Sequence, residues 1–241
     1  QKSLVEYNQT SSVSSVNKDD IKNLPIQSLS EIVNLQAGVI EGDFRGGRIG
    51  EVQYQVDGVT VNNPFSNSSM LEIDRSVIEE VQVISGTFDA KYGQAMSGVV
   101  NTVLKTGTEK FEYSLETYLC DYFTTDTYRY PNKDSYNPTA IQKYQLSLSG
   151  PTGLPQTTFF VNGRKYLNDG YMFGTRTFTP FDENDFQNQI YNPTGDGELI
   201  SMGTSDEWNG QFKVTNQTVK DLQFNYQLSY NYAERTGYNH A

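Results

Sequence analysis

The sequence has very few of the side chains on which most catalytic and metal sites depend. Its 241 residues include one cysteine, Cys120, and one histidine, His240, next to the C-terminus. A single cysteine excludes an internal disulfide framework and a zinc site built from several cysteines. One histidine leaves little room for histidine-based catalysis, and no paired acid–base motif takes its place. An enzyme is therefore the least favoured class of protein, and we expect no metal site and no cofactor.

The chain also lacks positive charge and long apolar runs. Its net charge is −11 and its pI about 4.5, which argues against a nucleic-acid partner because phosphate binding needs basic patches. No run of 18 apolar residues is present, so the sequence predicts no transmembrane helix. The 17 tyrosines nevertheless fit membrane-spanning β-strands, which are only half apolar and rich in aromatic residues.

The first half of the chain predicts a small mixed α/β domain. Residues 1–17 are polar and read as a flexible lead-in, with at most a short edge strand at 12–16. Ser28, followed three residues later by Glu31, is a capping-box pattern that starts a helix. The alternation in 51–61 predicts a strand interrupted at Asp57-Gly58. Further strands are expected at 81–84 and 99–105, with a glycine-punctuated loop between them.

The second half changes to alternating apolar and polar residues. The clearest case is 222–232, where leucine, phenylalanine and tyrosine occupy one face and amides and serine the other. A buried sandwich face favours valine, isoleucine and leucine, whereas tyrosine-rich faces on strands of about ten residues are typical of lipid-facing barrel strands. Strands of this kind are expected at 111–119, 143–149, 157–165, 210–215 and 222–232.

The connections between these strands differ in length. Residues 149–155 and 216–221 are short, whereas 120–140 and 167–206 are long, polar and acidic. Outer-membrane barrels have short turns at the periplasmic end and long loops outside the cell. We therefore expect the short connections to face the periplasm and the long ones the exterior.

Residues 78–108 resemble the C-terminal half of the plug domain of TonB-dependent outer-membrane receptors. Upstream, Phe44-Arg45-Gly46-Gly47 is similar to that family's "IRG" signature and Val56-Asp57-Gly58-Val59 to its "DG(V/I)" signature. Ser97 departs from the pattern, since many members carry a second glycine there. The matching residues of the main segment are Glu80, Val81, Val83, Gly86, Tyr92, Gly93, Ser97, Gly98, Val99, Val100 and Asn101.

The resemblance implies a fold of three parts. These are a lead-in at 1–17, a plug domain at 18–108 and the first strands and loops of an antiparallel transmembrane β-barrel at 109–241. Barrels that hold a folded plug have about 22 strands, so five strands cannot close one. An open edge in lipid would leave backbone groups unpaired. We therefore expect an incomplete barrel and an N-terminal portion of a longer polypeptide.

The function implied is active import across the outer membrane of a nutrient such as a glycan, peptide or metal chelate. A TonB-type inner-membrane energiser would pull an N-terminal box at or before Gln1, with outer-membrane lipid and a surface lipoprotein as further partners. The lead-in is similar to receptors preceded by a carboxypeptidase-regulatory-like domain. Two alternatives stay open: a structural subunit of a larger outer-membrane assembly, and an adhesin-like surface binding protein.

Site residues follow from the same resemblance. Arg45 and Glu80 are expected to form ion pairs between plug and barrel wall, although Arg45 with Arg48 could instead cradle an anion. Acidic runs at 182–185 and 196–198 could bind Ca²⁺ but lack the spacing of an EF-hand loop and fit solvated loops better. Ligand contact is predicted for Asn62, Asn63, Phe65 and Asn67, with an ordinary polar loop as the alternative.

Overall fold

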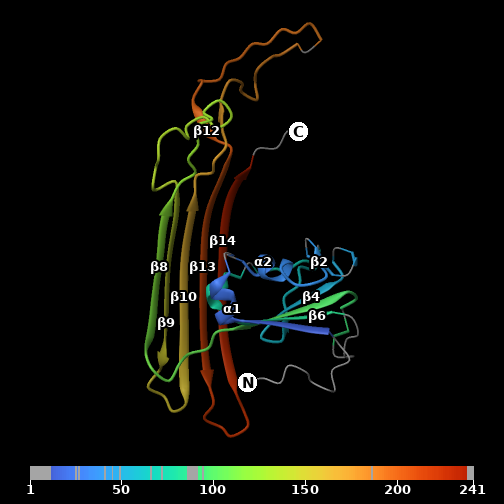
Figure 1. Cartoon of the computed structure of the whole chain (residues 1–241), viewed down its shortest axis with the longest axis vertical. Helices are drawn as coiled ribbons and strands as arrows, with labels where there is room; N and C mark the ends of the chain where they lie inside the picture. Colours follow the sequence, from blue (N-terminus) through green and yellow to red (C-terminus); the bar gives the residue numbers. More distant parts are fainter. Residues whose placement is uncertain are drawn as a thin grey trace. The chain divides into compact units, whose positions relative to one another are not determined.

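The computed structural model describes residues 12–24, 26, 28–40, 42–44, 46–48, 50–65, 67–71, 73–85, 92–93, 95–185 and 187–237. The chain divides into two compact units, Gln1–Gly107 and Thr108–Ala241 (Figure 1). Across the described residues, no helix is long and apolar enough to cross a bilayer.

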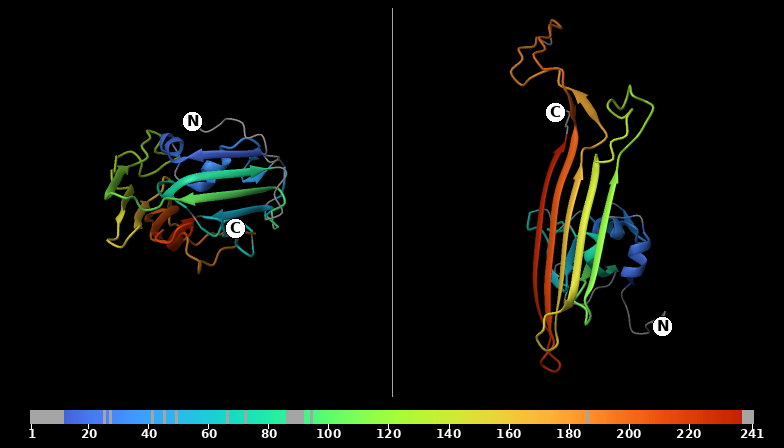
Figure 2. Two further views of the ribbon diagram at one scale, coloured as in Figure 1. Left: turned by 90° about the horizontal axis from the view of Figure 1, so that it is seen from below. Right: turned by 90° about the vertical axis from the view of Figure 1, so that its left-hand side faces the viewer.

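The first unit is built on a five-stranded sheet in the order β1-β6-β7-β4-β5 (Figure 2, left). Strands β4 and β7 run parallel, and the other neighbouring strands run antiparallel. Part of the expected lead-in thus belongs to the sheet as β1, paired along its whole length with β6. The strands are β1 (Ser12–Asn17), β4 (Val52–Val56), β5 (Val59–Thr60), β6 (Ile78–Ser85) and β7 (Gly98–Leu104).

Two short helices begin at side-chain caps. The Asn17 side chain accepts hydrogen bonds from the backbone N–H groups of Asp19 and Asp20, at 2.9 and 3.0 Å, where α1 (Lys18–Asn23) begins. Ser28 caps α2 (Leu29–Asn34) by accepting from the Glu31 backbone N–H at 3.4 Å, so the helix start predicted at Ser28 is confirmed. The Glu31 carboxylate accepts from the Ser28 hydroxyl at 3.3 Å. A 3₁₀ turn, η1 (Arg75–Val77), leads into β6, and β2 (Val39–Ile40) pairs with β3 (Asp43–Phe44).

The core of this unit is almost entirely aliphatic. Each such side chain stabilises the fold by about 1.5–3 kcal/mol on full burial. One aromatic ring joins them: Phe44, which is 1% exposed. The side chains of this unit that are no more than 2% exposed and apolar are Ile21, Ile32, Val33, Phe44, Ile78, Val81, Val99, Val100 and Leu104.

The second unit is an antiparallel meander with strands in the order β8-β9-β10-β13-β14 (Figure 2, right). Between β10 and β13, β11 (Phe173–Thr175) pairs with β12 (Leu199–Ser201). The long strands are β8 (Glu112–Cys120), β9 (Ile141–Pro151), β10 (Thr157–Asn168), β13 (Gly203–Asn216) and β14 (Phe224–Gly237).

The polarity of this sheet is inverted relative to a water-soluble protein. On β9, Tyr144, Leu146 and Leu148 are exposed, whereas Lys143 and Gln145 on the opposite face are buried. The same alternation runs through β14, whose exposed apolar side chains are Phe224, Tyr226, Leu228, Tyr230 and Tyr232. An apolar outer face on strands of this length suits lipid, and the expected fold class is confirmed.

Strands β13 and β14 are longer than the sequence predicted. A strand was expected only from Gly210, but β13 begins at Gly203 and runs for 14 residues. Residues 203–207 (GTSDE) carry no apolar alternation, so periodicity could not find them. Their backbone is nevertheless paired on both sides, with β10 along 205–207 and with β14 throughout. The long connection therefore shrinks from 167–206 to 169–202.

Gly98 is predicted to tolerate no side chain. A Cβ there would lie 2.7 Å from Cδ1 of buried Phe44. Gly98→Ala should therefore destabilise the first unit by about 1–3 kcal/mol, the usual cost of overpacking. Thermal unfolding read by proteolysis within residues 12–107 measures the effect. Gly93→Ala is the matched control, since nothing lies within 4 Å of its Cβ position, and an equal loss in both variants would contradict the steric explanation.

Candidate functional site

The glycine signatures of the first unit pack against one another across a separation of about 50 residues. A Cβ at Gly47 would lie 2.6 Å from the Ser97 Cβ and 3.0 Å from the Phe44 carbonyl oxygen. The backbone N–H groups of Met96 and Ser97 both donate to the Glu51 carbonyl, at 3.0 and 3.2 Å. These small residues allow two loops to approach closely, which gives the motif a packing role.

The Asp57-Gly58 pair makes the turn between β4 and β5. Asp57 has φ +49° and Gly58 φ +83°, conformations that glycine and aspartate tolerate best. The Asp57 carboxylate accepts from the backbone N–H of Leu104 at 3.1 Å, and its own N–H donates to the Thr102 carbonyl at 2.9 Å. The turn thus fastens the end of β4 to the end of β7.

The predicted ligand loop at 62–69 uses its amides to hold itself together. The Asn62 side-chain oxygen accepts from the Tyr54 backbone N–H at 2.7 Å, and its amide nitrogen donates to the Val52 carbonyl at 2.8 Å. Asn63 accepts from the Phe65 N–H at 2.9 Å, and the Asn67 amide donates to the Gly50 carbonyl. Phe65, by contrast, is 98% exposed. Its ring is therefore the member of this set best placed for an outside partner.

The remaining predicted residues are dispersed. Arg45 lies outside the described residues, so the expected ion pair with the wall stays a prediction, as does that of Glu80. Glu80 lies on β6, where the Ser15 hydroxyl donates to its carboxylate. Gly46 has φ +77°, the Tyr92 carbonyl accepts from the Ala95 N–H at 3.1 Å ahead of β7, and the Asn101 amide reaches Gln82 at 3.5 Å. Among the described residues no three His, Cys, Asp or Glu side chains converge as metal ligands.

The polar face of the second unit carries buried ion pairs. Glu207, 9% exposed at its side chain, lies 2.7 Å from Arg235 and 3.6 Å from Arg164, which is itself 8% exposed. Arg164 also donates to the Asn209 side chain at 3.0 Å. On the neighbouring strands the fully buried Lys143 ammonium donates to Glu116 at 2.8 Å. These charges cross-link β8 to β9 and β10 through β13 to β14.

Glu207→Gln should weaken the sheet. The substitution leaves the buried Arg164 without this carboxylate, and breaking a pair whose two partners are buried costs about 3–5 kcal/mol. The pair with Arg235, which is 54% exposed, contributes less. The temperature at which the barrel loses its heat-modifiable gel migration should fall. Glu234→Gln is the control, since Glu234 is exposed and lies opposite Asp206 on the other face. If both variants unfold at the same temperature, the Glu207 pairs contribute nothing to stability.

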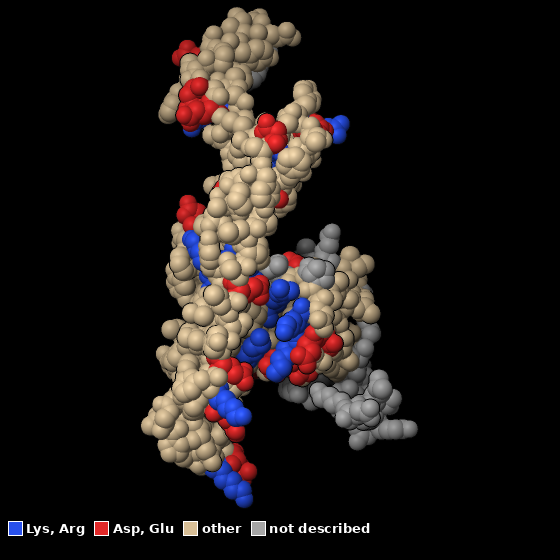
Figure 3. Space-filling view, turned by 60° about the vertical axis from the view of Figure 1, so that its left-hand side comes forward, with Lys and Arg blue, Asp and Glu red and all other residues tan. Residues whose placement is uncertain are grey.

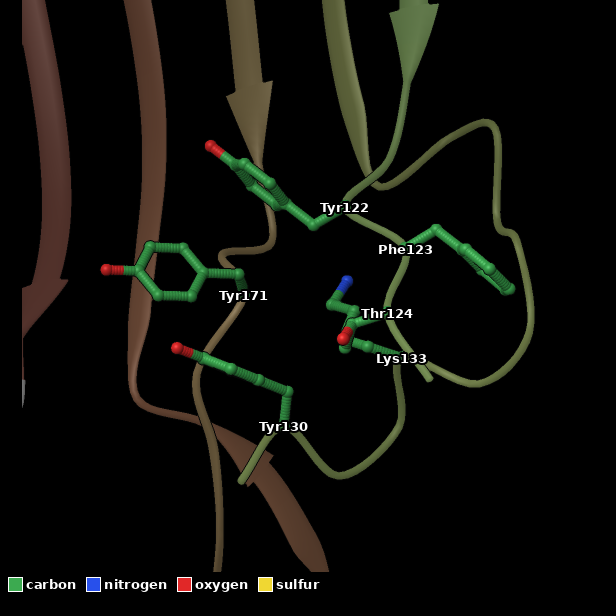
Figure 4. A pocket seen from close by; sticks show the side chains of 6 residues that line it. All are labelled: Tyr122, Phe123, Thr124, Tyr130, Lys133 and Tyr171. Atoms are coloured by element: carbon green, nitrogen blue, oxygen red, sulfur yellow. The ribbon is translucent and has the colours of Figure 1, made fainter. Parts of the chain in front are cut away.

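The two long loops meet at an aromatic pocket of about 220 Å³ (Figure 4). Its lining is Tyr122, Phe123, Thr124, Tyr130, Lys133 and Tyr171. Sequence reasoning missed this pocket. The available signal was the unusual number of aromatic residues in a connection expected to be merely polar: Tyr122, Phe123, Tyr128, Tyr130 and Tyr136.

A buried ion pair holds the first of these loops in shape. The Lys133 ammonium donates to the Asp121 carboxylate at 2.7 Å, and their side chains are 4% and 1% exposed. Burial alone would raise the pKa of Asp121. The hydrogen bonds from Lys133 and from the backbone N–H groups of Asn137 and Tyr122 outweigh it and lower that pKa.

The stability of this loop should decrease at acid pH. Since the pKa of Asp121 is lower in the folded loop, the stabilisation is complete above the ordinary carboxyl value of about 3.9 and is lost as pH falls through the lowered one. Hydrogen exchange of 121–140, corrected for intrinsic rates, should show full protection at pH 6 and progressively less protection as the pH falls below about 3.9. Lys133→Met should open the loop already at pH 6, by about 3–5 kcal/mol.

Arg129→Met provides the control within the same loop. Its pair with Asp126 at 3.7 Å is 76% and 44% exposed, and exposed pairs contribute little. Equal protection of wild type and Lys133→Met at pH 6 would refute the structural role of the pair.

The structure thus combines a small α/β unit with an antiparallel sheet whose apolar side chains are exposed and whose polar face carries buried charges. The family model described as "TonB-dependent Receptor Plug Domain" matches residues 5–100. Residues 5–100 therefore carry the plug domain of TonB-dependent receptors, and the resemblance noted in the sequence is confirmed.

Individual relatives and solved structures are consistent with the plug-domain match. The vitamin B12 transporter BtuB of Vibrio vulnificus (strain CMCP6) is 32% identical over 113 residues, which are 42% of this chain and 18% of that protein. The siderophore receptor PirA from Acinetobacter baumannii superposes with a TM-score of 0.62 at 19% identity, covering 92% of this chain and 32% of that one. A mutant ferric enterobactin receptor, PfeA, from Pseudomonas aeruginosa gives 0.61 at 15% identity, covering 94% and 34%. The chain thus spans about a fifth to a third of these proteins.

Proposed function

We propose that the complete protein is an active transporter that imports a nutrient, such as a glycan, peptide or metal chelate, across the outer membrane. In this proposal the plug domain gates the barrel. The observation that carries this proposal is the pairing of a plug domain with a sheet whose apolar face is exposed and whose polar face holds buried charges. A channel wall needs that polarity, whereas a soluble adhesin needs the opposite.

The lengths of the connections support an orientation for the proposed transporter. Turns 152–156 and 217–223 are short, while 121–140 and 169–202 are long. The short turns face the periplasm with the plug, and the long loops face the exterior. Ligand passing the outer loops next meets the plug apex at 62–69, where exposed Phe65 supports a contact role. Arg45 and Glu80 hold the plug to the wall until it moves.

An inner-membrane energiser of the TonB type supplies the work. It pulls an N-terminal box at or before Gln1, and β1, an edge strand of the sheet, is the first described element to receive that pull. A surface lipoprotein and a preceding carboxypeptidase-regulatory-like domain are further expected parts, supported by the character of the lead-in alone.

Removing the segment before Ser12 tests the transport mechanism without knowledge of the substrate. The complete receptor is compared with a variant in which everything between its signal sequence and Ser12 is replaced by a Gly-Ser linker of equal length. This change leaves β1 intact. Binding of the purified energiser C-terminal domain should weaken at least about tenfold, and energised uptake should stop.

Uptake is assayed with cobalamin, ferric siderophores and oligosaccharides in cells with and without the energiser. Undiminished energiser binding by the variant would refute pulling through this segment. A receptor that binds the energiser in neither form and imports nothing would instead be a structural subunit of an outer-membrane assembly.

A further inference from the structure

The aromatic pocket of the outer loops belongs to the second unit, and it shares no lining residue with the Glu207 and Lys143 ion pairs of the polar face. Its residues come from two connections: the one between β8 and β9, and the start of the one between β10 and β13. Three tyrosines form its centre. The rings of Tyr122 and Tyr171 meet edge to face with centroids 5.2 Å apart, and Tyr130 lies 6.2 Å from Tyr171. Figure 4 shows their hydroxyl groups pointing to the same side of the pocket.

The rings are available to a ligand. Tyr122 and Tyr171 are each 44% exposed, Phe123 62% and Tyr130 36%. A volume of about 220 Å³ is below the range of about 300–1,000 Å³ usual for whole ligands. The pocket is therefore sized for one ring of a larger molecule.

Charge restricts which ring it takes. The ammonium of Lys133 and the carboxylate of Asp121 neutralise each other and are almost completely buried, so neither offers a countercharge to a ligand. The connections 121–140 and 169–202 carry nine acidic residues against three basic ones, and acidic side chains are spread over these loops in the upper part of Figure 3. This negative field repels anionic groups.

A cationic group is disfavoured for a different reason. Tyrosine faces attract cations, but a cation here would lie beside the Lys133 ammonium, and no carboxylate is among the residues that line the pocket. A neutral ring meets neither obstacle. Aromatic faces accept a flat C–H surface, and the aligned hydroxyls can donate to and accept from hydroxyl groups at the edge of a ring.

We propose that this pocket binds a single neutral, hydroxylated ring, namely a sugar residue of an uncharged oligosaccharide. This inference rests on the proposed import function and specifies its substrate class. Tyr171 is the central contact because its ring touches both other tyrosines.

The test uses the complete receptor, purified from outer membranes, on a glycan array with uncharged, acidic and cationic oligosaccharides, and with short Phe-rich peptides as a separate arm. We expect uncharged glycans to bind. Tyr171→Ala should weaken that binding at least about tenfold, and Tyr171→Phe, which keeps the ring, by about two- to fivefold. Titration calorimetry with the best glycan gives these ratios.

Tyr128→Ala is the matched control. Tyr128 lies in the same loop, is 96% exposed and does not line the pocket, so its removal should leave affinity unchanged within about twofold. Tyr130→Ala gives a second pocket variant in case Tyr171→Ala disturbs the loop, and the hydrogen exchange of 121–140 reports such a disturbance.

Three results would overturn the proposal. In the first, neither Tyr171→Ala nor Tyr130→Ala weakens the binding of any uncharged glycan. In the second and third, the binding that these substitutions weaken is that of charged glycans, or that of the Phe-rich peptides alone. Binding is measured without the energiser, so it is separable from transport. Glycan binding that depends on the pocket, without energised uptake, would support the proposed glycan site and refute the proposed transport function. Energised uptake of another nutrient, with no glycan binding, would support the transport function and refute the glycan site.

Discussion

The second unit depends on complete backbone pairing between long antiparallel strands. Each unpaired N–H or C=O in hydrocarbon costs several kcal/mol, so a strand can face lipid only when its neighbours satisfy its backbone. In the described sheet β9, β10 and β13 are paired on both sides. Because the backbone hydrogen bonds between strands hold the sheet together, the side chains can adopt the opposite of the arrangement found in water-soluble proteins. Tyrosine, leucine and phenylalanine then turn outward, and lysine, arginine and glutamate are buried on the opposite face.

Buried charge on that face has a cost that only pairing can offset. Glu207 is placed between Arg164 and Arg235, and Lys143 reaches Glu116 on the adjacent strand. Each contact joins neighbouring strands, so the charges reinforce the order in which the ladder runs. The same principle recurs in the outer loop, where Lys133 and Asp121 are buried together and shape an aromatic pocket without giving it a net charge.

The first unit depends on a different feature, which is close backbone packing at glycines that have no side chain. Gly47 meets Ser97, and Gly98 meets the ring of Phe44, at distances that a Cβ could not occupy. Asp57 then fastens the turn after β4 to the end of β7. The family signatures are thus positions where backbones approach closely, which explains why they are recognisable in the sequence although their residues carry no reactive chemistry.

The sequence by itself determined the division into an α/β unit and alternating strands, the turn at Asp57-Gly58, the helix cap at Ser28 and the long and short connections. Each of these depends on local periodicity or on a residue's own backbone preference. Tertiary structure alone decided the rest. β13 extends back to Gly203 because its neighbours pair with a polar segment that has no pattern of its own. The side-chain amides of Asn62 and Asn67 are hydrogen-bonded within the domain because the segment that leads into β4 places the carbonyls of Val52 and Gly50 beside them. Tyr171 joins Tyr122 and Tyr130 because β9 and β10 return the chain to the same end of the sheet, a proximity that no local signal encodes.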